Sequence, residues 1–151
     1  MAAKESLMQY IEKLEDILER YFLHKAPEMP EGLKNAIVVF MPWVMIVIVV
    51  LSLPTIIALF GGAAFLPFTY VGQVSYGFMS ILSHLFGIAA VVFEVMAIPG
   101  LLNKTVKGWK LLFYSALLGL ISSLLMGNIF GFIISFVISM YIIFQIKEKY
   151  R

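Results

Sequence analysis

Four long apolar runs, separated by short segments that carry the charges, constrain this chain more than any other feature. The runs cover about 36–60, 75–98, 111–126 and 129–146. A helix needs about 20 apolar residues to cross the hydrocarbon core of a bilayer, where the backbone must satisfy its hydrogen bonds internally. The sequence therefore predicts an all-α membrane protein with four transmembrane helices.

Residues 1–25 mix charged and apolar side chains and predict one further helix. Its apolar residues recur at steps of four and three: Leu7, Ile11, Leu14, Leu18 and Tyr21. Charged residues fill the other face, so we expect an amphipathic helix whose seam joins copies of the chain or packs on the chain's own bundle. The lipid surface or another protein is the alternative partner, and the acid-rich polar face disfavours anionic headgroups.

Proline marks the expected domain boundaries. Pro27 and Pro30 predict a stiff, Pro-rich linker over 26–35, because the residue before a proline is biased out of helical geometry. A transmembrane domain over 36–146 and a basic tail over 147–151 are expected to follow.

Other breakers predict the limits of the spans. Pro42 is expected to restart the first span after a short interfacial helix. The Gly-Gly pair at 61–62 should end that span, and the Pro-Gly pair at 99–100 should close the second. Trp109 is predicted to anchor the following basic loop at the membrane interface.

The distribution of basic residues predicts the topology. Lys and Arg lie in the N-terminal segment, the 103–110 loop and the tail, whereas the 61–73 loop and the 127–128 turn carry none. With four spans, the three basic regions share one face, so both termini are expected in the cytoplasm. Three or five spans would place basic residues on both sides.

The second span carries a polar stripe at steps of three and four. It consists of Gly77, Ser80, His84, Gly87, Val91 and Glu94. Ser80, His84, Gly87 and Glu94 are candidates for lining a transport pathway, since polar groups inside a membrane are costly. Glu94 could instead pair with a lysine of the 103–110 loop, Lys104 or Lys107, and His84 could form a hydrogen bond between helices.

Small residues predict that the third and fourth spans form a tight antiparallel hairpin. They recur every four residues and coincide when reflected about the turn at 127: Ser115, Gly119 and Ser123 on one span, and Gly131, Ser135 and Ser139 on the other. Small side chains let two membrane helices approach closely, so this set is assigned to helix packing.

The segments 10–34 and 97–151 resemble a group of small bacterial four-span integral membrane proteins with no assigned function. The shared motifs are IPGL, KGW and GNIFG. The resemblance implies the four-span topology and a bacterial origin, and it attaches no mechanism to these motifs. We therefore expect an integral protein of the bacterial cytoplasmic membrane.

Catalytic and cofactor motifs are missing from the sequence. It has no cysteine, and its two histidines lie in no metalloprotease motif, so no metal site is predicted. A nucleophile elbow, a phosphate-binding loop and a basic nucleic-acid face are also absent. We therefore expect no enzyme activity, no cofactor and no nucleic-acid partner.

The polar stripe favours a homo-oligomeric channel or passive transport pathway for ions or small solutes. Four short spans are expected to line such a path only by sharing it among subunits. The alternative is a scaffold protein without transport that assembles in the bilayer through its N-terminal helix.

Overall fold

The computed structural model describes residues 2–65, 77–127 and 129–150, with the backbone alone at 2–8, 55, 58–65, 77 and 78. The described residues form five α-helices and no strand. These are α1 (Ala2–Glu19), α2 (Glu31–Phe65), α3 (Gly77–Leu102), α4 (Val106–Leu125) and α5 (Ile129–Gln145). A π-helical turn, η1 (Arg20–Lys25), extends α1, and a 3-10 turn, η4 (Lys147–Lys149), follows α5.

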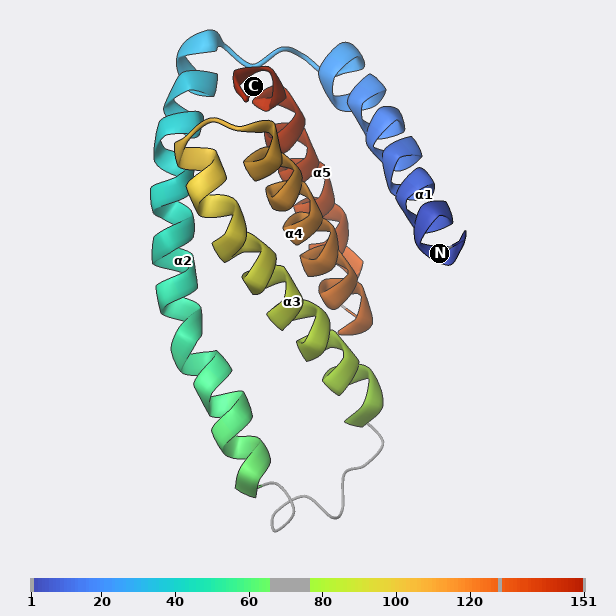
Figure 1. Ribbon diagram of the computed structural model, residues 1–151, viewed down its shortest axis with the longest axis vertical. Coiled ribbons are helices and arrows are strands. Elements are labelled where there is room, and N and C mark those ends of the chain that lie inside the picture. Colours follow the sequence, from blue (N-terminus) through green and yellow to red (C-terminus); the bar gives the residue numbers. More distant parts are fainter. Residues whose placement is uncertain (1, 66–76, 128, 151) are drawn as a thin grey trace.

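Four of these helices are long and apolar enough to cross a membrane. The qualifying stretches are Glu31–Pro54, Met79–Leu102, Val106–Leu125 and Ile129–Lys149. Figure 1 shows α2 to α5 side by side as a bundle, with α1 outside it on the side of α5. This arrangement agrees with the predicted all-α membrane protein with four spans. The predicted outer loop lies mostly at 66–76, outside the described residues.

The linker is shorter than predicted. Helix α2 already begins at Glu31, so the linker covers 26–30 and not 26–35. The carbonyl of Pro30 accepts hydrogen bonds from the backbone N–H groups of Leu33 and Lys34, which starts the first helical turn. Proline fits this position because the first N–H groups of a helix have no intrahelical partner.

The prolines and glycines predicted to limit the membrane spans do not break their helices. Pro42 lies inside α2 with its side chain fully buried, and α2 continues through the Gly-Gly pair at 61–62 to Phe65. No separate interfacial helix precedes the span. Pro99 lies inside α3, which ends only at Leu102. At each proline the rest of a long apolar helix outweighs the loss of one backbone hydrogen bond, because lipid leaves the backbone few other partners.

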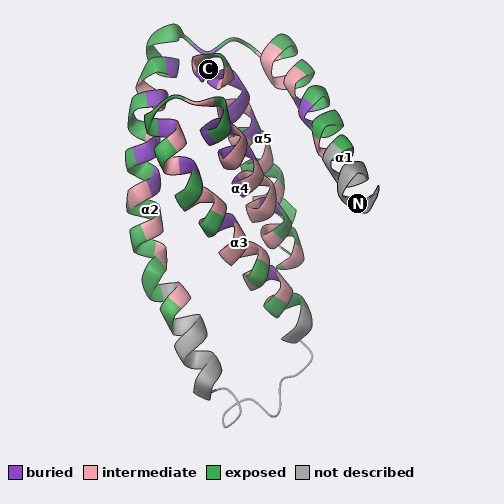
Figure 2. Cartoon of the chain, viewed as in Figure 1, coloured by how far each residue is buried: buried purple, intermediate pink, exposed green. Residues whose placement is uncertain are grey.

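Buried side chains gather at the end of the bundle where α4 begins and α5 ends (Figure 2). Trp109 stacks on Phe113 with ring centroids 5.8 Å apart, and Phe144 meets both rings edge-on. The indole N–H of Trp109 donates to the carbonyl of Ile143 at 2.8 Å. Trp109 is only 1% exposed, so the prediction that it anchors a loop at the membrane surface is wrong. It is a core residue whose polar atom is satisfied by α5.

A buried glutamine fastens the linker to α5. Gln145 accepts a hydrogen bond from the backbone N–H of Met29 and donates to the carbonyls of Phe22 and Pro27. The hydroxyl of Tyr141 donates to the same Pro27 carbonyl at 2.9 Å. These bonds supply partners to backbone groups that the proline-rich segment cannot pair within a helix.

Lys147 connects α1 to the end of α5. Its Nζ lies 2.9 Å from a carboxylate oxygen of Glu15 and 2.7 Å from one of Glu19. The same ammonium lies over the Trp109 ring, 4.7 Å from its centroid, and 5.8 Å from that of Phe144. The acids of α1 therefore pair with the C-terminal tail.

The face of α1 that meets the bundle is not the predicted seam. The contacting side chains are Ile11, Glu15, Leu18 and Phe22, again at steps of four and three. Ile11 and Leu18 of the predicted seam therefore pack on the chain's own bundle. Leu14 and Tyr21 are exposed, and the side chain of Leu7 lies outside the described part.

The backbones of α3 and α4 approach each other closely at two glycines. A Cβ placed on Gly100 would lie 2.5 Å from the Cα of Gly108, so neither position has room for a side chain. Between them, Thr105 caps α4 by accepting a hydrogen bond from the Gly108 N–H and donates to the Gly100 carbonyl. By contrast, a Cβ on Gly119 would meet no described atom within 4 Å. The backbone contact expected at Gly119 is therefore absent, and Gly100 and Gly108 supply such a contact instead.

Candidate functional site

The packing face of α3 is offset by about one residue from the predicted polar stripe. Its buried side chains are Ser83, Ala90, Ala97 and Leu101, at steps of seven, seven and four. Ser80, His84 and Val91 of the stripe are only half-buried and flank this face. Gly77 begins α3, where the structure describes the backbone alone. The stripe is therefore the border of a helix contact, not its centre.

Ser83 and Ser122 form the hydrogen-bonded contact between helices that was predicted for His84. Each hydroxyl donates to the other residue's carbonyl at 2.9 Å, and the two Oγ atoms lie 3.0 Å apart. The Nδ1 of His84 instead lies 2.6 Å from the carbonyl of Ser80 in the same helix. A ring nitrogen at this distance from a carbonyl is a donor, so the bond keeps His84 within α3.

His84 lines a cavity of about 280 Å³ between α2, α3 and α4. We call it the His84 cavity. Its lining residues are Ile56, Ser83, His84, Gly87, Ile88, Val91, Ser122 and Met126. A Cβ on Gly87 would lie 3.5 Å from the Ser122 hydroxyl, an ordinary contact distance. Gly87 therefore contributes open volume to this cavity, next to the serine pair.

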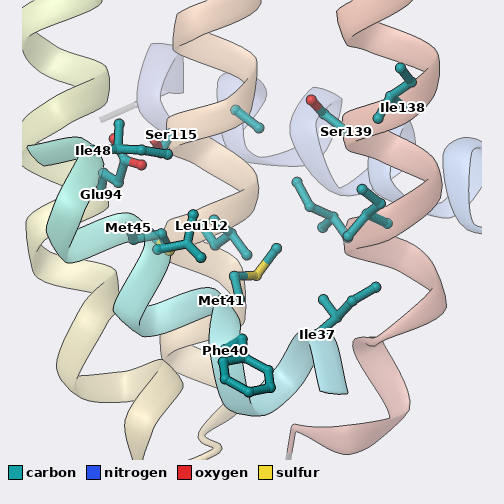
Figure 3. Close-up of a pocket in the computed structure, with 14 residues that line it drawn as sticks. Ile37, Phe40, Met41, Met45, Ile48, Glu94, Leu112, Ser115, Ile138 and Ser139 are labelled. Carbon is teal, nitrogen blue, oxygen red and sulfur yellow. The ribbon is translucent and has the colours of Figure 1, made fainter. Parts of the chain in front are cut away.

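Glu94 lines a second and larger cavity of about 460 Å³, which we call the Glu94 cavity. Its walls come from α2, α4 and α5 as well as α3, and they are apolar apart from Glu94 and the hydroxyls of Ser115 and Ser139. In Figure 3 Glu94 lies beside Ser115, and Ser139 lies on the far side of the space, on α5. A half-buried carboxylate therefore faces a cavity whose remaining surface is hydrocarbon.

The predicted partners of Glu94 do not reach it. Lys104 and Lys107 are exposed, and within the described part of the chain no cation lies within the ion-pair distance of 4.0 Å from Glu94. Lys104 adopts a left-handed backbone conformation with φ 53° in the turn after α3. Glu94 lies eight residues before the end of α3, about 12 Å along the axis, which separates it from that turn.

The two cavities follow one another along the same three helices. On α3 they are separated by the step from Val91 to Glu94, about one helical turn. On α2, Ile48 lines the Glu94 cavity and Ile56 lines the His84 cavity. On α4, Ser115 lines the Glu94 cavity and Ser122 the His84 cavity. Both cavities are lined by residues of a single chain. A path shared among subunits stays a prediction.

The mirrored small residues do not make one contact surface. Ser115 and Ser139 point into the Glu94 cavity, Ser123 and Gly131 are half-buried, and Ser135 is exposed. Although these residues are spaced four apart on each helix, only Ser115 and Ser139 line the cavity. The predicted tight hairpin of α4 and α5 stays a prediction.

Three residues that matter here were not among the sequence candidates: Ser83, Ser122 and Gln145. Ser83 precedes His84 directly, and it continues a spacing of four and three through Gly87 to Ala90. That second spacing was a usable signal for a packing face. No signal of comparable strength singles out Gln145, which is one polar residue near a helix end.

Metal binding has no support in this region. Among the residues that the structure describes, no three His, Cys, Asp or Glu side chains gather closely enough to hold a metal ion. The chain also has no cysteine. Glu94 therefore stands as a single carboxylate and not as part of a ligand set.

Comparison with known proteins gave no match to a family model, a curated protein or a solved structure.

Proposed function

We propose that this integral membrane protein provides a channel or passive transport pathway for small solutes. The observation that supports the proposal is the succession of the His84 and Glu94 cavities along α2, α3 and α4. Together they carry the His84 imidazole and the Glu94 carboxyl group of the stripe, whereas Ser80 lines neither cavity. Their hydroxyls come from four other serines, Ser83, Ser115, Ser122 and Ser139. Polar side chains inside a membrane commonly mark the route of a solute.

Of the two solute classes expected, small organic solutes fit these walls better than inorganic ions. An ion that leaves water needs several polar groups in place of its hydration shell. The Glu94 cavity offers one carboxylate and two hydroxyls within a hydrocarbon surface. A passing solute must therefore bring apolar surface of its own.

The pathway is tested by osmotic permeability of proteoliposomes to glycerol, methylammonium and choline. We expect wild-type protein to raise the permeability to at least one solute above that of protein-free liposomes. Val91→Trp should abolish the increase, because Val91 lines the His84 cavity. Val92→Trp is the matched control, since Val92 is exposed and lines neither cavity. Background permeability for all three solutes, or a Val91→Trp variant as permeable as wild type, would contradict the proposal.

The second proposal concerns assembly through an amphipathic α1, as a homo-oligomeric transporter or as a scaffold without transport. A row of exposed apolar residues supports it, adjacent to the face that meets the bundle. The row consists of Tyr10, Leu14, Ile17 and Tyr21. Such a row on a helix with charged neighbours suits contact with a second copy of the chain.

Light scattering of purified protein tests this assembly. The double substitution Leu14→Glu and Ile17→Glu should reduce the particle mass, because it places charge in the exposed row. Lys13→Glu, at an exposed and already charged position, should leave the mass unchanged. If the double variant keeps the wild-type mass, α1 does not join subunits. An intact oligomer without permeability to any solute would favour the scaffold.

A cytoplasmic location for both termini belongs to the same proposal. The linker and the C-terminal tail lie at one end of the bundle, held by Gln145 and by the pairing of Lys149 with Glu31. The predicted basic 103–110 loop lies at that end too, as the turn 103–105 and the first residues of α4 (Figure 1). The positive-inside rule supports placing this end in the cytoplasm, in agreement with a bacterial cytoplasmic membrane.

A further inference from the structure

The Glu94 cavity opens sideways, between α2 and α5. Several of its lining side chains are also about half exposed on the outer surface of the bundle: Phe40, Val44, Ile48 and Ile138. These residues belong to the apolar stretches that qualify as membrane spans. A molecule dissolved in the bilayer therefore reaches the cavity without passing through water.

The inner end of this opening carries a single acidic side chain, Glu94. Glu94 has no ion-pair partner within the described part of the chain, and the nearest polar neighbours on the cavity wall are serine hydroxyls. A carboxylate in such surroundings costs free energy unless a cation accompanies it. The apolar walls in turn favour a ligand with hydrocarbon surface.

We propose that the Glu94 cavity binds a small amphiphile with a cationic head, taken up laterally from the lipid bilayer. The head pairs with the Glu94 carboxylate, and the apolar tail lies along α2 towards Phe40 and Val44. The Glu94 cavity has a volume of about 460 Å³, within the range of roughly 300–1,000 Å³ that is typical of small-molecule sites. This inference rests on the proposed transport function, for which it names the substrate class.

Other ligand classes fit the cavity less well. An anion would be repelled by Glu94, and a fully polar solute would leave its hydrogen-bonding groups unpaired against hydrocarbon. An inorganic cation would find one carboxylate where a metal site requires several ligands. Only a ligand that combines a positive charge with apolar surface matches both parts of the cavity.

The test measures binding of radiolabelled decyltrimethylammonium to the full chain in phosphatidylcholine nanodiscs, with empty nanodiscs subtracted. Decyl maltoside provides a neutral head on the same tail, and decyl sulfate an anionic one. We expect wild-type protein to bind the cation at least about tenfold more tightly than either comparator, as a partly desolvated ion pair requires. Equal binding of the cationic and neutral compounds would overturn the inference, and this comparison needs no variant.

Substitutions then localise the site. Glu94→Gln should weaken cation binding at least about tenfold, Glu94→Asp should retain it, and Ser139→Phe should block it by filling the cavity. Glu28→Gln removes the same charge from the exposed linker and should have no effect. Wild-type affinity in Glu94→Gln would place the cation elsewhere and contradict the inference.

Binding and permeability separate the two proposals. Charge-selective binding without solute flux would support this site and remove the transport function. Flux without charge-selective binding would leave the pathway standing and remove the inference about its substrate.

Discussion

Ser83 and Ser122 join α3 and α4 through a pair of hydroxyl groups. Each donates to the carbonyl of the other residue, so the contact ties both side chains and both backbones of α3 and α4. Hydrogen bonds of this kind between membrane helices are individually modest, because the unfolded chain in a membrane also finds partners.

We predict that Ser83→Ala lowers the free energy of unfolding by about 1 kcal/mol, since the substitution removes one donor and leaves the Ser122 hydroxyl with fewer partners. Thermal unfolding in detergent measures the change. Ser123→Ala is the matched control, because Ser123 follows directly in α4 and is only half-buried. Equal stability of the two variants would show that the serine pair contributes nothing to folding.

The predicted pathway residues His84 and Glu94 differ in their hydrogen-bond partners. The Nδ1 of His84 bonds within its own helix, so His84 lines the cavity without that nitrogen joining two helices. Glu94 has no such local partner in the described part of the chain, and it is the residue on which the proposed binding of a cationic amphiphile depends.

At the scale of helices, the crossing of α3 and α4 depends on two glycines that face each other. Gly100 and Gly108 bring the two backbones into contact, and Thr105 closes the short turn between them. The motifs IPGL and KGW each contain one of these glycines, so both motifs have a structural explanation.

We predict that Gly108→Ala destabilises the protein by about 2 kcal/mol or more, because its Cβ would overlap the backbone of α3. Gly119→Ala should be neutral or should stabilise α4 by up to about 1 kcal/mol, because alanine favours a helix over glycine and the space is open. Denaturation of both variants in the same detergent gives the comparison. The reverse order of stability would mean that α4 packs most tightly at Gly119.

At the scale of the whole molecule, contacts between distant segments hold one end of the bundle together. Gln145 and Tyr141 bind the linker, Lys147 binds α1, and Lys149 binds the start of α2. Next to them, the hydroxyl of Tyr150 is buried without a partner among the described residues, and burial raises the pKa of Tyr150 to about 12. This end therefore combines the charged segments with the best-packed part of the core.

The absence of cysteine permits a direct test of the topology. Glu28→Cys lies at the charged end and Met126→Cys at the opposite end of α4, and both positions are exposed. In intact cells a membrane-impermeant maleimide should label Met126→Cys, and Glu28→Cys should react only after the cells are opened. Labelling of Glu28→Cys in intact cells would place the termini outside and reverse the proposed orientation.

The sequence by itself determined the helical class and the four candidate spans. Long apolar runs can satisfy their backbone in lipid only as helices, and charges at membrane depth are expensive. These constraints act on each segment separately, so they require no knowledge of its neighbours. Because lipid offers the backbone no other hydrogen-bond partners, the helices continue through Pro42 and Pro99 and do not end there.

Only the tertiary structure decided which face of each helix is buried. Lipid tails are as apolar as leucine, so hydrophobic spacing does not distinguish a side chain that packs on a helix from one that faces lipid. On α3 the buried face includes Ser83 and Ala90 and borders the polar stripe, and Trp109 lies in the core where the sequence suggested the interface. The pair of cavities likewise depends on how α2 lies against α3 and α4, a relation between segments that no single segment encodes.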